Sequence, residues 1–151
     1  MNNNLGIIMK FSITVFVFTL IFFSNNIFAD NIDGRVAIKV SSKVKIQILE
    51  DMRKNLTSIQ LIVAALANED FEQVVKIAGE LGSMDHTEEA MMRRKSLSEE
   101  YRSLGPQLHM GFQSLSRDAR DFGDVQHSLG QLSNVMNVCV ACHQGYRLEV
   151  E

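Results

Sequence analysis

Residues 125–146, VQHSLGQLSNVMNVCVACHQGY, decide which fold this chain is expected to adopt. Apolar side chains recur in this stretch at every third or fourth position, which is typical of a helix with one buried face. Asp124 precedes the first of them and is a suitable N-cap. The stretch is therefore predicted to be the last helix, with its two cysteines on the buried face. The expected stripe consists of Val125, Leu129, Leu132, Val135 or Met136, Cys139, Cys142 and Tyr146.

The end of this stretch, Cys139-Val140-Ala141-Cys142-His143, has the C-x-x-C-H pattern of covalent c-type haem attachment. In such a site two thiols form thioethers with the haem, and the following imidazole becomes an axial ligand of the iron. On a helix, residues three and four positions apart share one face. We therefore expect one haem c per chain, bonded to Cys139 and Cys142 and ligated by His143.

The two cysteines allow three other interpretations. A thiol redox pair would need a thioredoxin-like βαβ context, and no strand is predicted before Cys139. A zinc site typically needs about four ligands in two pairs, and the chain has 2 cysteines without a matching histidine pair. A disulfide is the default for an exported protein. The adjacent His143 favours haem over the disulfide.

The first 29 residues are typical of an export signal. Lys10 is followed by an apolar run from Phe11 to Phe23, then by polar residues and a small residue, Ala29, at which cleavage is expected. The apolar run is shorter than the roughly 20 residues of a membrane-spanning helix, so no stable membrane insertion is expected. In a bacterium this signal predicts the periplasm, where c-type haem is attached.

The remaining residues, 30–151, are enough for one domain. The whole chain has a net charge of −3, and removal of Lys10 with the signal makes it −4. This charge argues against nucleic acid as a partner, because phosphate contacts require a basic surface. An acidic protein would be steered toward a basic patch on its partner.

Three further helices are predicted upstream of the motif. The first begins at Ser41 or Ser42 and ends near Ala67, with apolar residues at a spacing of three or four. The second extends from Phe71 to Gly82, and the third from Gly105-Pro106 to Gly123. Residues 83–105 form a long connection with a helical piece from Thr87. Residues 36–40 alternate weakly, so an extended conformation is also compatible with them. With no convincing sheet, these helices predict an all-α protein, an antiparallel four-helix bundle with a covalent haem at the last helix.

This chain resembles the class II c-type cytochromes, the family of cytochrome c prime and its low-spin relatives. The resemblance extends from residue 41 to residue 147 and is carried by the C-terminal motif, Cys139-Val140-Ala141-Cys142-His143-Gln144-Gly145-Tyr146-Arg147. It implies an exported four-helix bundle with haem on the last helix. It also implies a homodimer that pairs through the first two helices.

The resemblance further implies that the sixth position of the iron faces the first helix, at the position that Met52 occupies here. A methionine on an apolar stripe is otherwise ordinary core packing. Met136 lies on the motif's own helix and is expected to pack. His109 in the third helix is the main rival for the sixth position, and His86 and His127 are expected to be solvated or capping residues.

Two residues after the motif have candidate roles. Arg147 could pair with a haem propionate or shape the proximal side, or equally be a solvated cation at a helix C-terminus. Tyr146 is expected to pack, with its hydroxyl directed outward.

The expected function is single-electron transfer with periplasmic redox proteins, since an iron with two axial ligands has no open site. If Met52 does not bind iron, the alternative is a five-coordinate haem protein that binds NO or CO as a sensor or scavenger. A haem enzyme such as a peroxidase would need a distal acid or base. No residue other than His109 offers one, so catalysis is not expected.

Overall fold

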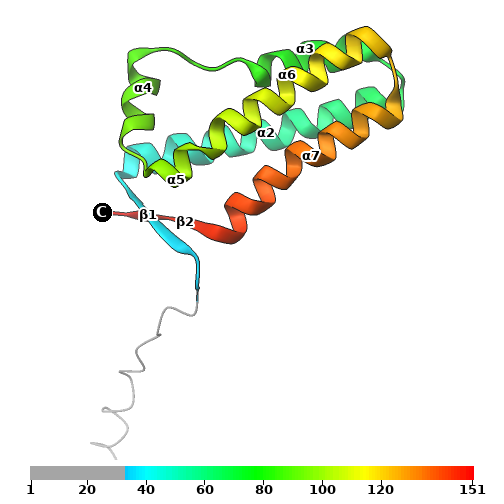
Figure 1. Ribbon diagram of the computed structural model, residues 1–151. Helices are drawn as coiled ribbons and strands as arrows, with labels where there is room; N and C mark the ends of the chain where they lie inside the picture. Colours follow the sequence, from blue (N-terminus) through cyan, green and yellow to red (C-terminus); the bar gives the residue numbers. More distant parts are fainter. Residues whose placement is uncertain (1–32) are drawn as a thin grey trace, which may run out of the picture. The chain divides into compact units, whose positions relative to one another are not determined.

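The structure is a computed structural model that describes residues 33–151, and the predicted export signal lies outside these residues. The expectation of a predominantly helical protein is confirmed, and one short sheet accompanies the helices (Figure 1). In chain order the elements are β1 (Val36–Val40), α2 (Ser42–Ala67), α3 (Phe71–Gly82), α4 (Glu88–Lys95), α5 (Glu99–Arg102), α6 (Leu104–Phe122), α7 (Val125–Gly145) and β2 (Tyr146–Val150).

Side-chain caps fix where the helices other than α6 begin. Each cap accepts a hydrogen bond from a backbone N–H three residues later, one of the groups that the first helical turn leaves without a partner. At the C-terminal end of α6, Gly123 adopts a left-handed conformation with φ of 56°, which a glycine tolerates and which stops the helix. The longer helices are capped by Ser41 to Val44 N at 3.3 Å, Asp70 to Gln73 N at 3.1 Å and Asp124 to His127 N at 2.6 Å, and the cap at Asp124 was predicted.

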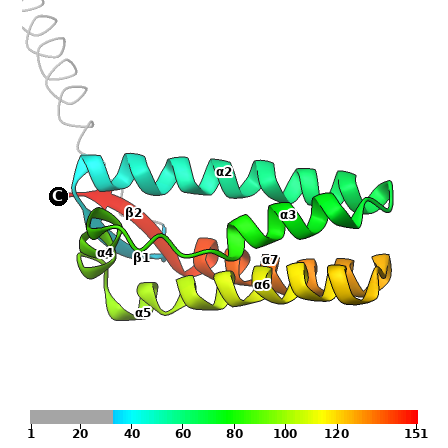
Figure 2. The same cartoon turned by 90° about the horizontal axis from the view of Figure 1, so that it is seen from above.

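One hydrophobic core joins α2, α3, α6 and α7. Helix α3 packs against α2 and α6, and α7 packs against α6 and α2. Figure 2 shows α3 beside the part of α2 nearest the α2–α3 turn, whereas the strands, α4 and α5 lie toward the other end of α2. The buried members of the core are Ile62, Ala65, Leu66, Val74, Ile77, Ala78, Phe112, Leu115, Ala119, Leu132 and Val135.

Helices α6 and α7 approach each other closely at Gly111. A Cβ at this position would lie 2.5 Å from Cγ2 of Val135, which is closer than van der Waals contact permits. The absence of a side chain at Gly111 therefore lets α6 and α7 pack closely at Val135, one helical turn before Cys139 of the C-x-x-C-H motif.

The sequence predicted no convincing sheet, but the structure contains one short sheet that includes residues 36–40. Strands β1 and β2 pair in parallel, from Val36 with Tyr146 to Val40 with Val150. Ile38 and Val40 are buried in the process. The pairing joins the two ends of the domain, and such a long-range contact leaves only a weak alternation in either strand.

Three apolar residues that the helical spacing assigned to inward faces are instead exposed, and polar residues take two inward positions. Asn55 is half-buried on α2 and Ser128 is fully buried on α7. The helical period was correct, but the buried face of these helices is rotated by about one residue at these points. The exposed residues are Leu56, Phe122 and Leu129.

Candidate functional site

The C-x-x-C-H motif lies in the last turns of α7, as predicted. Along this helix Ser128, Leu132 and Val135 are buried, and Cys139 and Cys142 continue the same face at the same spacing. Both thiols are free and half-buried, whereas His143 is exposed. The helix thus presents two thiols along one face, with the imidazole one residue beyond the second.

The hydrophobic core stops short of these thiols. Val135 is the last residue of α7 in the core cluster, and Ile59 is the first residue of α2 packed against it. In the part of α2 before Ile59, Ile48 is buried, whereas Met52 and Asn55 on the same face are half-buried. The motif end of the helices is therefore less completely packed by side chains than the opposite end.

Burial controls the ionisation of both thiols. It raises the pKa of Cys139, and it is also the main cause of a raised pKa at Cys142. The motif also lies at the C-terminal end of a helix, where the helix dipole disfavours a negative charge. Reactive thiolates are found in the opposite environment, at helix N-termini or beside cations.

Tyr101 of α5 contacts the motif, which the sequence did not predict. Its ring lies edge-on to Tyr146, with centroids 5.6 Å apart, and its side chain influences the ionisation of the Cys142 thiol. Burial, followed by the effects of Cys142, raises the pKa of Tyr101 to about 12. No periodic pattern marks this residue, because α5 has only 4 residues and its position depends on the fold of the connection.

The end of α7 is held by both strands. Arg35, just before β1, donates a hydrogen bond from Nη1 to the backbone carbonyl of His143 at 3.3 Å. The backbone N–H of Tyr146 donates to the carbonyl of Cys142. These contacts occupy carbonyls that a helix C-terminus leaves without intrahelical partners.

Met52 lies on the inward side of α2, in line with the buried Ile48. Its neighbour Asp51 is exposed and pairs with Arg93 of α4 at 2.9 Å. Lys43 and Gln47 both contact Glu89 at 3.0 Å, so α4 is attached to this half of α2 by polar contacts. The structure thus places Met52 on the inward face expected for it, and its proposed bond to iron stays a prediction.

Arg147 lies in strand β2, so the expectation that it sits on a helical turn was wrong. Helix α7 ends at Gly145, because the chain becomes extended at Tyr146 to pair with β1. The Arg147 guanidinium contacts Glu149 through Nη1 and Oε2 at 3.0 Å. A contact of Arg147 with a propionate stays a prediction.

The other candidates have different environments. His109 is half-buried, and its Nδ1 lies 2.8 Å from the Leu81 carbonyl, so this nitrogen donates to the end of α3. His86 and Met136 are exposed. The contact of His109 with α3 accounts for its position without a role at the motif.

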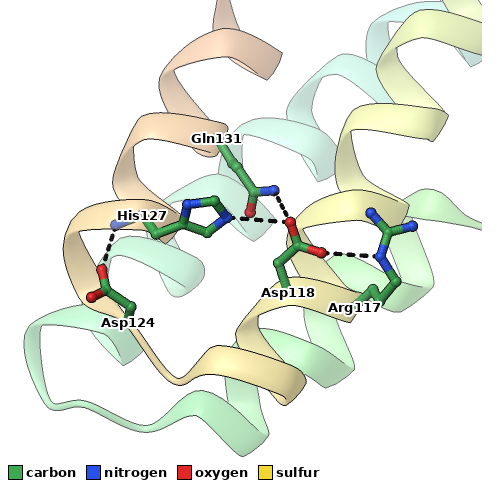
Figure 3. A network of polar contacts seen from close by, with 5 residues as sticks. All are labelled: Arg117, Asp118, Asp124, His127 and Gln131. Carbon is green, nitrogen blue, oxygen red and sulfur yellow. Dashed lines mark hydrogen bonds and ion pairs between the residues drawn. The ribbon is translucent and has the colours of Figure 1, made fainter.

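A second polar cluster joins α6 to α7 near their connecting turn (Figure 3). The Asp118 carboxylate accepts hydrogen bonds from His127 Nε2 at 3.2 Å, Gln131 Nε2 at 2.6 Å and Arg117 Nε at 3.0 Å. These contacts, the one from His127 foremost, lower the pKa of Asp118. The ring of Phe122 lies edge-on to His127 at 5.6 Å. The cluster was not predicted, and we interpret it as a structural link between the helices.

Within residues 33–151, no three His, Cys, Asp or Glu side chains are grouped so as to hold a metal ion. No helix in that part of the chain combines the length and apolarity needed to cross a membrane. Comparison with protein families, with curated proteins and with solved structures gave no match to this chain. The functional interpretation therefore depends on the residues themselves.

Proposed function

We propose that this protein is an exported c-type cytochrome that carries single electrons between periplasmic redox proteins. Residues 1–29 would be removed as a signal, and residues 30–151 would hold one haem c. The observation that carries the proposal is the C-x-x-C-H motif on the inward face of α7, where the hydrophobic core ends.

The donor set fits a covalently bound haem. Cys139 and Cys142 would form the thioethers, and His143 would supply one axial imidazole. A haem needs no group of three protein ligands, because the porphyrin supplies the four equatorial nitrogens. When bound, the haem would supply a one-electron couple. The two cysteines and His143 would hold one edge of the haem against α7. The haem itself would complete the apolar interior beyond Val135 and Ile59.

The environment of the thiols supports haem over thiol redox chemistry. A redox C-x-x-C pair depends on a stabilised thiolate, usually at the start of a helix. Here burial raises the pKa of both thiols, and the pair occupies the end of the helix. Thioether formation makes these sulfurs permanently neutral, which suits a half-buried site.

We further propose an antiparallel four-helix bundle of α2, α3, α6 and α7. The packing of α2 with α3 and of α6 with α7 across short turns supports this arrangement. In such a bundle, side chains on the inward face of α2 would contribute to the cofactor site together with those of α7. Met52 would then be the second axial ligand, and a Met/His pair raises the reduction potential of the iron. With both positions filled, the protein would act as a carrier and not as an enzyme.

The alternative proposal is a five-coordinate haem that binds NO or CO, with Met52 as packing only. Absorption spectra of the oxidised and reduced protein distinguish the two. A low-spin oxidised spectrum with no response of the reduced protein to CO supports the electron carrier. A high-spin spectrum that changes with CO supports the gas-binding protein, and a protein without haem absorption contradicts both.

A further inference from the structure

The last turn of α7 is bonded to a residue that lies far from it in the sequence. Arg35 directly precedes β1, and its Nη1 donates a hydrogen bond to the backbone carbonyl of His143 at 3.3 Å. The two residues are separated by 108 positions. The contact therefore depends on the folded domain, and it reaches the histidine of the C-x-x-C-H motif itself.

The pairing of the strands places Arg35 at this position. Val36 pairs with Tyr146, so Arg35 lies where α7 passes into β2 (Figure 1). The N–H of Tyr146 is bonded to the carbonyl of Cys142. The Arg35 guanidinium is bonded to the next carbonyl, that of His143. Two of the last carbonyls of α7, which lack partners within the helix, are thus occupied by groups of the two strands.

A permanently charged donor suits this end of the helix. The C-terminus of a helix carries a partial negative charge, which stabilises a cation placed there. Helix α7 itself contains no Asp, Glu, Lys or Arg. A permanent positive charge at its end therefore has to come from another part of the chain, and an arginine is always protonated.

We propose that Arg35 is a positioning residue for the axial ligand His143, whose backbone it holds in place while the imidazole binds the haem iron. This inference rests on the proposed function. It assigns a role at the iron to a residue outside the C-x-x-C-H motif and outside the helices.

The physical basis is the tendency of helix ends to open. The last turn has few intrahelical bonds, and an imidazole in that turn moves with its backbone. Contacts that surround a metal ligand orient it and tune the metal, even when they do not touch the metal. Arg35 contacts the main chain of His143 and not its ring, so the contact is compatible with a bond between the imidazole and iron.

The test removes one positive charge from each of two positions on β1 or directly before it. Arg35→Gln weakens the contact with His143. Lys39→Gln is the matched control, because Lys39 is exposed, shares a face of the strand with position 35 and pairs with Glu149, away from the motif. Arg35→Lys keeps a cation at the end of the helix. Each full chain is produced with its export signal in a bacterium that attaches haem c.

Two measurements on the haem-bearing proteins follow the last turn of α7. Hydrogen exchange of residues 140–146, measured by mass spectrometry, reports how often this turn opens. The electron paramagnetic resonance spectrum of the oxidised iron reports the orientation of its axial ligands, in a five-coordinate and in a six-coordinate haem alike. Thermal unfolding is recorded in parallel.

In Arg35→Gln we expect hydrogen exchange of the last turn to become about two- to fivefold faster, the factor that corresponds to loss of a cation at a helix C-terminus. The resonance signal should show a second orientation of the axial ligand. Exchange around Leu132, in the middle of α7, should not change. Arg35→Lys should show a smaller effect, and Lys39→Gln should match wild type.

Several results would overturn this inference while leaving the proposed function in place. They include an unchanged result of Arg35→Gln in either measurement, an equal effect of Lys39→Gln, and an Arg35→Lys effect as large as that of Arg35→Gln. Faster exchange along the whole of α7 would indicate general destabilisation and would also contradict it. So would loss of haem from Arg35→Gln, because a positioning role leaves both thioethers intact. A wild-type protein without covalent haem would instead overturn the proposed function.

Discussion

Val135 and Cys139 lie one helical turn apart on the same face of α7, yet only Val135 belongs to the hydrophobic core. Val135 is 3% exposed and packs against α6, whereas the Cys139 thiol is half-buried and lies outside the core cluster. On α2 the same change occurs between Ile59, which packs against the core, and Met52, which is outside it. In our account a haem completes the interior of the protein at this boundary.

Replacement of Met52 by alanine tests the second axial ligand. If its thioether binds iron, the oxidised wild type is low-spin with the long-wavelength band of a Met–iron bond. Met52→Ala should abolish that band and lower the reduction potential, because the soft thioether that favours the ferrous state is lost. The reduced variant should also bind CO. Absorption spectra and a redox titration measure these changes.

The control for this experiment is Met136→Ala, which removes an exposed methionine from the motif's own helix. Its spectrum and potential should match those of wild type. If Met52→Ala leaves the spectrum unchanged and His109→Ala alters it, the ligand belongs to α6 and the assignment of Met52 is wrong.

The cluster at Asp118 makes stability depend on pH. The hydrogen bond from His127 and the contacts of Arg117 and Gln131 lower the pKa of Asp118 in the folded protein. A lowered folded-state pKa stabilises the protein above the unfolded-state value of about 3.9, and this contribution is lost as pH falls through the folded-state pKa. Asp118→Asn should therefore reduce the free energy of unfolding at pH 7. The difference from wild type should disappear at low pH.

Urea unfolding at several pH values measures this difference, and Asp121→Asn supplies the comparison. Asp121 is an exposed acid on the same helix. Its substitution should change stability little at any pH. If the free energy of unfolding of Asp118→Asn stays below that of wild type by the same amount down to the lowest pH, the loss of stability comes from packing and not from the charge of Asp118.

The contact between α6 and α7 is tested by a pair of glycine substitutions. At Gly111 a new Cβ would lie 2.5 Å from Val135 Cγ2, so Gly111→Ala should lower the free energy of unfolding by about 1–3 kcal/mol. At Gly130 of α7 nothing lies within 4 Å, so Gly130→Ala should raise it by about 0.5–1 kcal/mol through helix propensity. Thermal unfolding of the two variants should therefore shift in opposite directions, and a shared direction would contradict the described packing.

Local sequence signals predicted the helices well. Asp124 was recognised as a cap, and the start of α2 was placed at Ser41 or Ser42, because capping needs only one side chain and the next few backbone groups. The end of α6 at Gly123 followed from the same local rule.

The features that the sequence did not predict depend on contacts between distant residues. The pairing of Val36 with Tyr146 has no local signature strong enough to distinguish it from a loop and a helix end. The ring contact of Tyr101 with Tyr146 likewise requires the folded connection. At Leu129 and Ser128 the helical period allowed either residue to face inward, and the folded structure buries the serine and exposes the leucine.

The most direct test of the central claim is the intact mass of the protein purified after export. The account predicts a chain without residues 1–29 whose mass is increased by one haem that acid and acetone do not remove. A chain of bare mass, with Cys139 and Cys142 as free thiols or joined in a disulfide, would contradict it.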